Sequence, residues 1–155
     1  MSGVLVLRNR QRARPIDTRY LRRIIQSVLQ DELWLNDFEI GVYLVGVSEM
    51  IRVNETYLKH AGPTDVISFN YGSDASNHAI CGELIVCVAV AVSQGRRFRT
   101  TWQSELVRYI IHGTLHLIGY DDLTARARHR MKSEEDRLVR RAANQFSFSR
   151  VRLKP

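Results

Sequence analysis

Two histidines four residues apart, His112 and His116, are the residues of this chain best suited to chemistry. Positions i and i+4 of a helix lie on one face, so both imidazoles can bind a single metal ion. Gly119 marks the helix end, where glycine readily adopts the left-handed conformation that turns the chain back towards the histidines. We predict that His112, His116 and Asp122 bind one divalent ion, zinc above all, with a fourth position open as in catalytic sites. Asp121 is the rival third ligand.

The spacing His-x3-His-x2-Gly-x2-ligand is also that of the metzincin metalloproteases, which carry a glutamate directly after the first histidine as general base. Gly113 occupies that position here. A hydrolytic metal site without the protease base favours hydrolysis of something other than a peptide. Two alternatives stay open. The histidines can be hydrogen-bonded core residues, and two histidines with one carboxylate also form the ligand set of non-haem iron oxygenases.

The same stretch resembles the YbeY family of bacterial endoribonucleases, the rRNA maturation factors, whose pattern is His-Gly-x-Leu-His-Leu-x-Gly-Tyr-Asp-His. Residues 112–121 match that pattern. Further blocks are similar and occur in the same order, so that the likeness covers about residues 40 to 140. These blocks are Asn54 with Tyr57, Pro63 to Phe69, and Gly82 to Ile85.

Two positions depart from the family pattern. Asp122 stands where the family has its third histidine, and Leu58 stands where it has an arginine after the tyrosine. The resemblance implies that this arginine acts at the phosphate. Arg108, one turn before His112, and Lys59 are therefore the candidates to replace it as catalytic residues.

The resemblance implies a single-strand-specific, metal-dependent endoribonuclease that acts in rRNA maturation and ribosome quality control, with rRNA and the ribosome as partners. Within the Pro63 to Phe69 block, Thr64 and Asp65 are the predicted substrate-binding residues. The two departures from the pattern favour an alternative from a different class. In that alternative the chain is a non-catalytic rRNA or ribosome assembly factor whose metal is structural.

The charge of the chain suits a polyanionic partner. The net charge is +7, and all but three of the 23 basic residues are arginine, whose planar fork matches phosphate oxygens two at a time. The first 23 residues contain a single acidic residue. We predict that four arginines there bind RNA phosphates: Arg8, Arg10, Arg12 and Arg14. A purely solubilising role for these charges is the alternative.

Length and composition predict one domain over residues 1–155. Cys81 and Cys87 lie six residues apart in one predicted strand, which separates them by roughly 20 Å and excludes a disulfide between them. No apolar run approaches the length of a membrane span and no signal peptide is evident, so we expect a cytoplasmic protein with buried thiols.

Helical periodicity over residues 101–118 places the histidines on a mostly apolar, buried helix with one polar stripe facing a cleft. Thr100 and Gln103 suggest its capping box, while Asp17, Ser48 and Thr124 are predicted caps of other helices. We predict an α+β fold with a small mixed sheet, and the resemblance implies a zincin-like one. The expected strands cover residues 4–7, 39–47, 66–71 and 83–87, and the other helices 17–30, 48–60, 88–98 and from 124 on. An exposed loop at 72–78 and a frayed tail from 146 complete the expectations.

Overall fold

The structure, a computed structural model, describes residues 3–60, 62–72 and 78–155. Most of the predicted loop at 72–78 therefore lies outside the described residues. Among the helices of the described part, none is long and apolar enough to cross a membrane.

In the described part of the chain, four strands form one mixed sheet in the order β1-β2-β4-β3. Their bounds are β1 (Gly3–Asn9), β2 (Phe38–Val45), β3 (Val66–Asn70) and β4 (Ile80–Cys87). β1, β2 and β4 run parallel, and β3 is antiparallel to β4 at the edge, with Val66 opposite Val86. The predicted mixed sheet is confirmed, and β4 starts three residues earlier than expected. Cys81 and Cys87 are buried free thiols of this strand.

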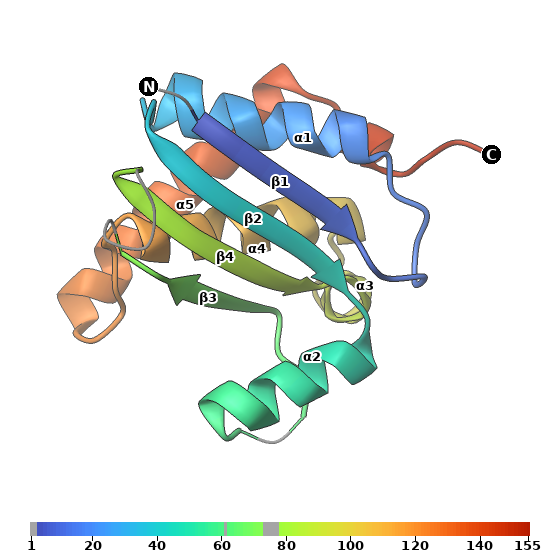
Figure 1. Cartoon of the computed structure of the whole chain (residues 1–155). Coiled ribbons are helices and arrows are strands. Elements are labelled where there is room, and N and C mark those ends of the chain that lie inside the picture. The colour runs from blue at the N-terminus through green and yellow to red at the C-terminus, as the bar shows by residue number, and fades with distance from the viewer. Residues whose placement is uncertain (1–2, 61, 73–77) are drawn as a thin grey trace.

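The described residues form five α-helices; α1 and α4 lie on one face of the sheet, and α5 packs against α4 on that side (Figure 1). They are α1 (Thr18–Gln26), α2 (Val47–Val53), α3 (Val88–Phe98), α4 (Trp102–Leu117) and α5 (Ala125–Gln145). Short π-helical segments extend α1 over Ser27–Glu32 and α2 over Asn54–Leu58. The α+β fold class is thus confirmed.

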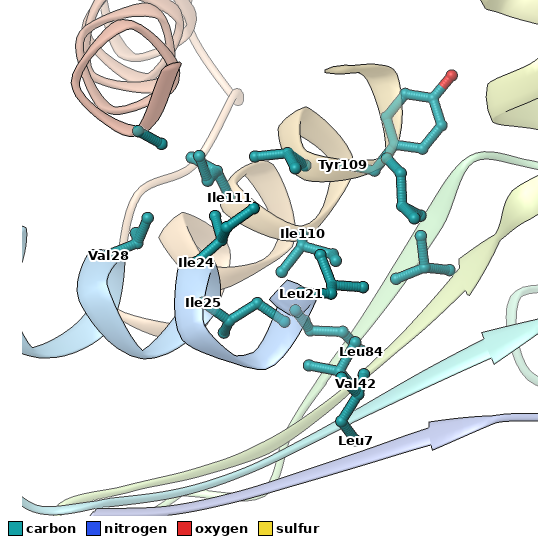
Figure 2. Close-up of a cluster of buried hydrophobic side chains, with 14 of the residues drawn as sticks. Leu7, Leu21, Ile24, Ile25, Val28, Val42, Leu84, Tyr109, Ile110 and Ile111 are labelled. Carbon is teal, nitrogen blue, oxygen red and sulfur yellow. The ribbon is translucent and has the colours of Figure 1, made fainter. Parts of the chain in front are cut away.

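The main core lies between the sheet and these helices, and Figure 2 shows its centre. Leu21 and Ile24 of α1 meet Val42 and Leu84 of the central strands, and Ile110 of α4 joins them from the same side of the sheet as α1. Each of these side chains is at least 97% buried, which stabilises the fold by roughly 1.5–3 kcal/mol per side chain. A smaller cluster on the opposite face packs α2 against the sheet around Met50.

Helix α4 sits close to the sheet and is fixed to β3 by two hydrogen bonds. Ser68 Oγ donates to the carbonyl of Gly113 at 3.2 Å, and Asn70 Nδ2 donates to the carbonyl of Leu117 at 3.4 Å. Gly82 of β4 permits this approach, because a Cβ there would lie only 2.6 Å from Leu117 Cδ2. The helix that carries the histidines is therefore held at a set height above the sheet.

Local capping was predicted with mixed success. Asp17 and Thr124 cap α1 and α5 as expected. The predicted Thr100 cap of α4 is wrong, since Thr101 accepts from the Ser104 N–H while the Thr100 hydroxyl donates to Glu105. The helix predicted to follow Ser48 instead begins at Val47, with Gly46 in the cap position.

The C-terminal tail is docked rather than frayed over residues 146–152. A 3₁₀ turn covers Phe148–Val151, and the Val151 side chain is fully buried. Arg152 forms a β-bridge with Ile16, and the N–H of Asp17 donates to the Val151 carbonyl at 2.8 Å. The expectation of a frayed tail was wrong because these contacts join the two ends of the chain, which no local pattern reveals.

Candidate active site

Helix α4 brings His112 and His116 together, with ring centroids 4.9 Å apart. Both side chains are half-buried and line a cleft of about 350 Å³ beside β3. The other lining residues are Leu58, Asp65, Val66, Ile67, Ser68, Asn70 and Leu117. Of the predicted polar stripe, the two histidines face the cleft, whereas Arg108 binds carboxylates of α5.

Within the described residues, the hydrogen bonds of the two rings engage Nδ1 and leave Nε2 of each ring without a partner. His112 Nδ1 lies 2.7 Å from Glu135 Oε1, and His116 Nδ1 lies 3.1 Å from the Tyr120 carbonyl oxygen. A carboxylate and a carbonyl only accept, so both Nδ1 atoms carry the proton. In the neutral ring, each Nε2 then keeps its lone pair for another partner. Paired neutral imidazoles with oriented Nδ1–H groups are the donors that a zinc ion takes in proteins, so these residues fit the predicted metal.

Asp122 lies on the exposed loop that follows α4. The loop turns at Gly119, whose φ of +109° confirms the left-handed helix end expected there. Within the part of the chain that the structure describes, no three His, Cys, Asp or Glu side chains are arranged to hold an ion. The histidine pair is thus in place, and Asp122 as third ligand stays a prediction.

Asp121 and Asp122 differ in their surroundings. Asp121 Oδ1 accepts from the Leu123 N–H at 3.0 Å, and the residue lines a separate cavity of about 280 Å³ with Arg130. Asp122 instead exerts an attraction that helps to raise the pKa of His112. Neither carboxylate is among the residues that line the cleft with the histidines, so the choice between them as third ligand stays open.

Sequence patterns did not identify Glu135, the carboxylate behind His112. It is 4% exposed and belongs to α5. Burial opposes its ionisation, but hydrogen bonds from His112 and Arg108 outweigh burial and hold the pKa of Glu135 below its usual value. The same hydrogen bond raises the pKa of His112 against the effect of burial. One signal was available: Glu135 falls on the helical stripe of Met131, Leu138 and Ala142, all of which are buried.

The two predicted catalytic cations lie in different surroundings. Arg108 NH1 donates to Glu135 Oε2 and to Asp136 Oδ1, both at 2.6 Å. Burial disfavours its charge, yet these hydrogen bonds keep the pKa of Arg108 above its usual value. Such pairing favours a structural task over direct contact with a phosphate. Lys59 is exposed, terminates the turn after α2 with a φ of +56°, and is not among the residues that line the cleft.

Leu58 and Asp65 flank the histidines in the cleft wall. The position where the resembled family has an arginine therefore faces the cleft and carries an apolar side chain. Asp65 Oδ1 accepts from the Val66 N–H at 2.7 Å, and its charge adds to the attraction that raises the pKa of His112. Thr64 contacts Asp65 at 3.5 Å. Of the two predicted substrate-binding residues, Asp65 lines the cleft and Thr64 is its neighbour.

The four N-terminal arginines lie beyond the cleft. The sheet register places Arg8 in one row with Tyr43, Ile85 and Ile67, so about 14 Å of sheet separates its backbone from the cleft edge. Arg10 pairs with Glu49 at 3.0 Å. The Arg14 guanidinium donates to its neighbouring carbonyl, while the side chains of Arg8 and Arg12 are exposed and have no hydrogen bond or ion pair to the described residues.

Gly113 also bears on the comparison with proteases. A Cβ at this position would lie 2.8 Å from Leu84 Cδ2 and 3.1 Å from Val66 Cγ2. A side chain on residue 113 would therefore point at the packed sheet. A glutamate here, as the metzincins have it, would have to displace these side chains.

The chain is an α+β protein whose mixed sheet packs against a helix that carries a histidine pair. The solution structure of TM1509 from Thermotoga maritima has a similar fold, with a TM-score of 0.66 and 23% sequence identity over 92% of this chain and 91% of that one.

Sequence comparisons identify the family. The family model described as Endoribonuclease YbeY matches residues 6–143. Curated relatives of the same name include those of Chlorobium luteolum, 40% identical over 79% of this chain and 87% of the relative, and of Syntrophotalea carbinolica, 31% identical over 97% of both. The chain belongs to the YbeY family.

Proposed function

We propose that this chain is a metal-dependent endoribonuclease that cuts single-stranded RNA. Its YbeY relatives are named endoribonucleases. Metal dependence is supported by the orientation of His112 and His116. The Nδ1 atom of each ring is hydrogen-bonded, and Nε2 of each ring has no partner among the described residues. A core histidine pair without function would not need two Nε2 atoms kept available beside a cleft.

The residues proposed to hold the ion are His112, His116 and Asp122. A divalent cation bound there would supply Lewis-acid activation of water and of the scissile phosphate. The chain's own contribution is orientation. Glu135 and the Tyr120 carbonyl fix the imidazole rings, and Ser68 and Asn70 fix the helix that carries them.

The surroundings of the cleft support an unpaired RNA strand as the substrate. Tyr57, next to Leu58 of the cleft wall, is 66% exposed and packs edge-on against Phe69 at 5.4 Å. An exposed ring held in place by a second ring offers a surface on which an unpaired base can stack. The net charge of +7 attracts the phosphate backbone. We extend the proposal to rRNA as the substrate, the ribosome as a partner and the cytoplasm as the location.

A second function has its own observation in its favour. Leu58 lines the cleft at the position where the resembled family has an arginine, so the site lacks that positive charge. The alternative is a ribosome or rRNA assembly factor that binds RNA and uses its metal structurally. It predicts zinc and RNA binding without cleavage.

The test uses a fluorescent single-stranded RNA oligonucleotide and the same sequence in a duplex, with wild-type protein and the His112→Ala and His116→Ala forms. We expect wild-type protein to cut the single strand in preference to the duplex, and both variants to lose most activity. Tight RNA binding without any cleavage by metal-loaded wild-type protein would support the assembly factor instead. Equal cleavage by all three proteins would contradict the proposed site.

A further inference from the structure

Glu135 is a buried carboxylate whose two oxygens have different partners on α4. Oε1 accepts from His112 Nδ1 at 2.7 Å, and Oε2 accepts from Arg108 NH1 at 2.6 Å. Lys132, one turn earlier on α5, approaches Oε2 at 3.4 Å. One side chain therefore connects the histidine to a cationic anchor on the same face of α4.

A buried carboxylate stays ionised when a cation donates a hydrogen bond to it, and Arg108 is that cation for Glu135. Its NH1 reaches Asp136 as well, so one guanidinium holds two successive residues of α5. Because an ionised carboxylate has no proton to donate, Glu135 can only accept from His112. The proton of His112 is then confined to Nδ1, and Nε2 is left facing away from α5.

We infer that Glu135 and Arg108 are positioning residues, with Glu135 setting the tautomer and ring orientation of His112 and Arg108 holding Glu135 in place. The inference rests on the proposed function in one respect, which is that Nε2 of His112 binds the metal ion. The tautomer itself is a property of the metal-free protein. His116 is oriented differently, by the main-chain carbonyl of Tyr120, and so needs no such side chain.

Glu134 provides a matched control. It precedes Glu135 on α5, is the same residue type, and pairs with Arg137 at 2.6 and 2.9 Å without contacting α4 histidines. The Glu135→Ala protein should fold, because Arg108 keeps Asp136 as a partner and is partly exposed. Glu135→Gln retains an oxygen that can accept from Nδ1, and it is the conservative variant for rescue.

The first measurement is the ¹⁵N chemical shift of the imidazole nitrogens in metal-free protein at about pH 9, well above the ordinary histidine pKa of about 6.5. In wild-type and Glu134→Ala protein we expect His112 to be protonated on Nδ1 alone. In Glu135→Ala it should become a mixture of tautomers, while His116 in the same spectrum stays unchanged. An unaltered His112 tautomer in Glu135→Ala would overturn the inference.

The second measurement is the affinity for zinc by competition with a chelator. Loss of a partner that orients a ligand weakens metal binding by about 10- to 100-fold. We expect this loss in Glu135→Ala, partial recovery in Glu135→Gln and wild-type affinity in Glu134→Ala. Equal losses in the Ala variants of Glu134 and Glu135 would show a general effect on α5 and overturn the inference.

The part played by Arg108 is tested by Arg108→Ala alone and together with Glu135→Ala. If Arg108 acts through Glu135, the double variant binds zinc no more weakly than Glu135→Ala. If Arg108→Ala keeps wild-type zinc affinity but cuts RNA more slowly at saturating zinc, Arg108 acts on the RNA and its positioning role is wrong. The zinc affinity and the His112 tautomer can both be measured in a protein that does not cut RNA. A protein without endoribonuclease activity would therefore contradict the proposed function and leave the test of the positioning role intact.

Discussion

Leu58 stands in the cleft wall at the position where the resembled family pattern has an arginine. It lies in the cleft wall with both histidines and is 42% exposed, so a longer side chain there could reach the cleft without displacing core residues. The nearby cations do not take its place in the described structure. Arg108 is held by two carboxylates, and Lys59 lies outside the cleft lining.

We predict that Leu58→Arg increases RNA cleavage. A guanidinium there would meet the phosphate in a charge-assisted hydrogen bond of about 1.5–3 kcal/mol, or roughly 10- to 100-fold in rate if the contact forms only in the transition state. Initial rates with a saturating RNA oligonucleotide measure the effect, and Leu58→Gln is the uncharged control of similar length. If Leu58→Arg binds its full complement of metal but cuts RNA no faster than wild-type protein, an arginine at this position does not contribute to cleavage in this chain.

At the scale of elements, the site depends on how closely α4 approaches the sheet. Gly82 of β4 lies beneath Leu117 and beside the backbone of Phe69, to whose carbonyl oxygen a Cβ would come within 2.7 Å. Backbone cannot move aside as the end of a flexible side chain can. The glycine therefore sets the distance between the histidine helix and β4.

We predict that Gly82→Ala destabilises the protein by about 1–3 kcal/mol, the usual cost of overpacking a core. Gly46→Ala is the matched control, since no atom lies within 4 Å of its Cβ position and its backbone is extended. Urea unfolding followed by circular dichroism measures both variants. Similar midpoints for the two proteins would show that α4 can shift away from the sheet at little cost.

The sequence could predict features that lie within one helix or turn, but it could not predict contacts between elements. The α4 helix, its histidine face and the Gly119 turn follow from spacings within one element, and the structure has all three. The contact between His112 and Glu135 joins two helices across 23 positions and depends on how α5 packs, so periodicity alone could not reveal it. The docked tail escaped prediction for the same reason, because Val151 finds its partners near residue 16.

At the scale of the whole molecule, basic residues are spread beyond the cleft. Of the four predicted phosphate-binding arginines, Arg8 and Arg12 have side chains without a hydrogen-bond partner among the described residues, whereas the Arg10 side chain pairs with Glu49. They lie near the opposite edge of the sheet from the cleft. An RNA strand that reaches both regions must therefore cross the molecule.

We predict that the logarithm of the RNA association constant falls linearly with the logarithm of the salt concentration. The double change Arg8→Ala and Arg12→Ala should make this slope shallower by about 1.4, because each phosphate that is no longer neutralised contributes about 0.7. Arg10→Ala should change the slope less, because Glu49 already neutralises that charge. Fluorescence anisotropy at several salt concentrations gives the slopes. An unchanged slope in the double variant would remove these two arginines from the RNA-binding surface.

The central claim is that His112 and His116 together hold a divalent ion, and elemental analysis of protein purified without added metal tests it most directly. We predict about one divalent ion per wild-type chain, as a single three-ligand site requires. The His112→Ala and His116→Ala forms should each lose most of it. His129→Ala, which removes an exposed histidine of α5, should retain it. Full metal content in both His112→Ala and His116→Ala would contradict the claim.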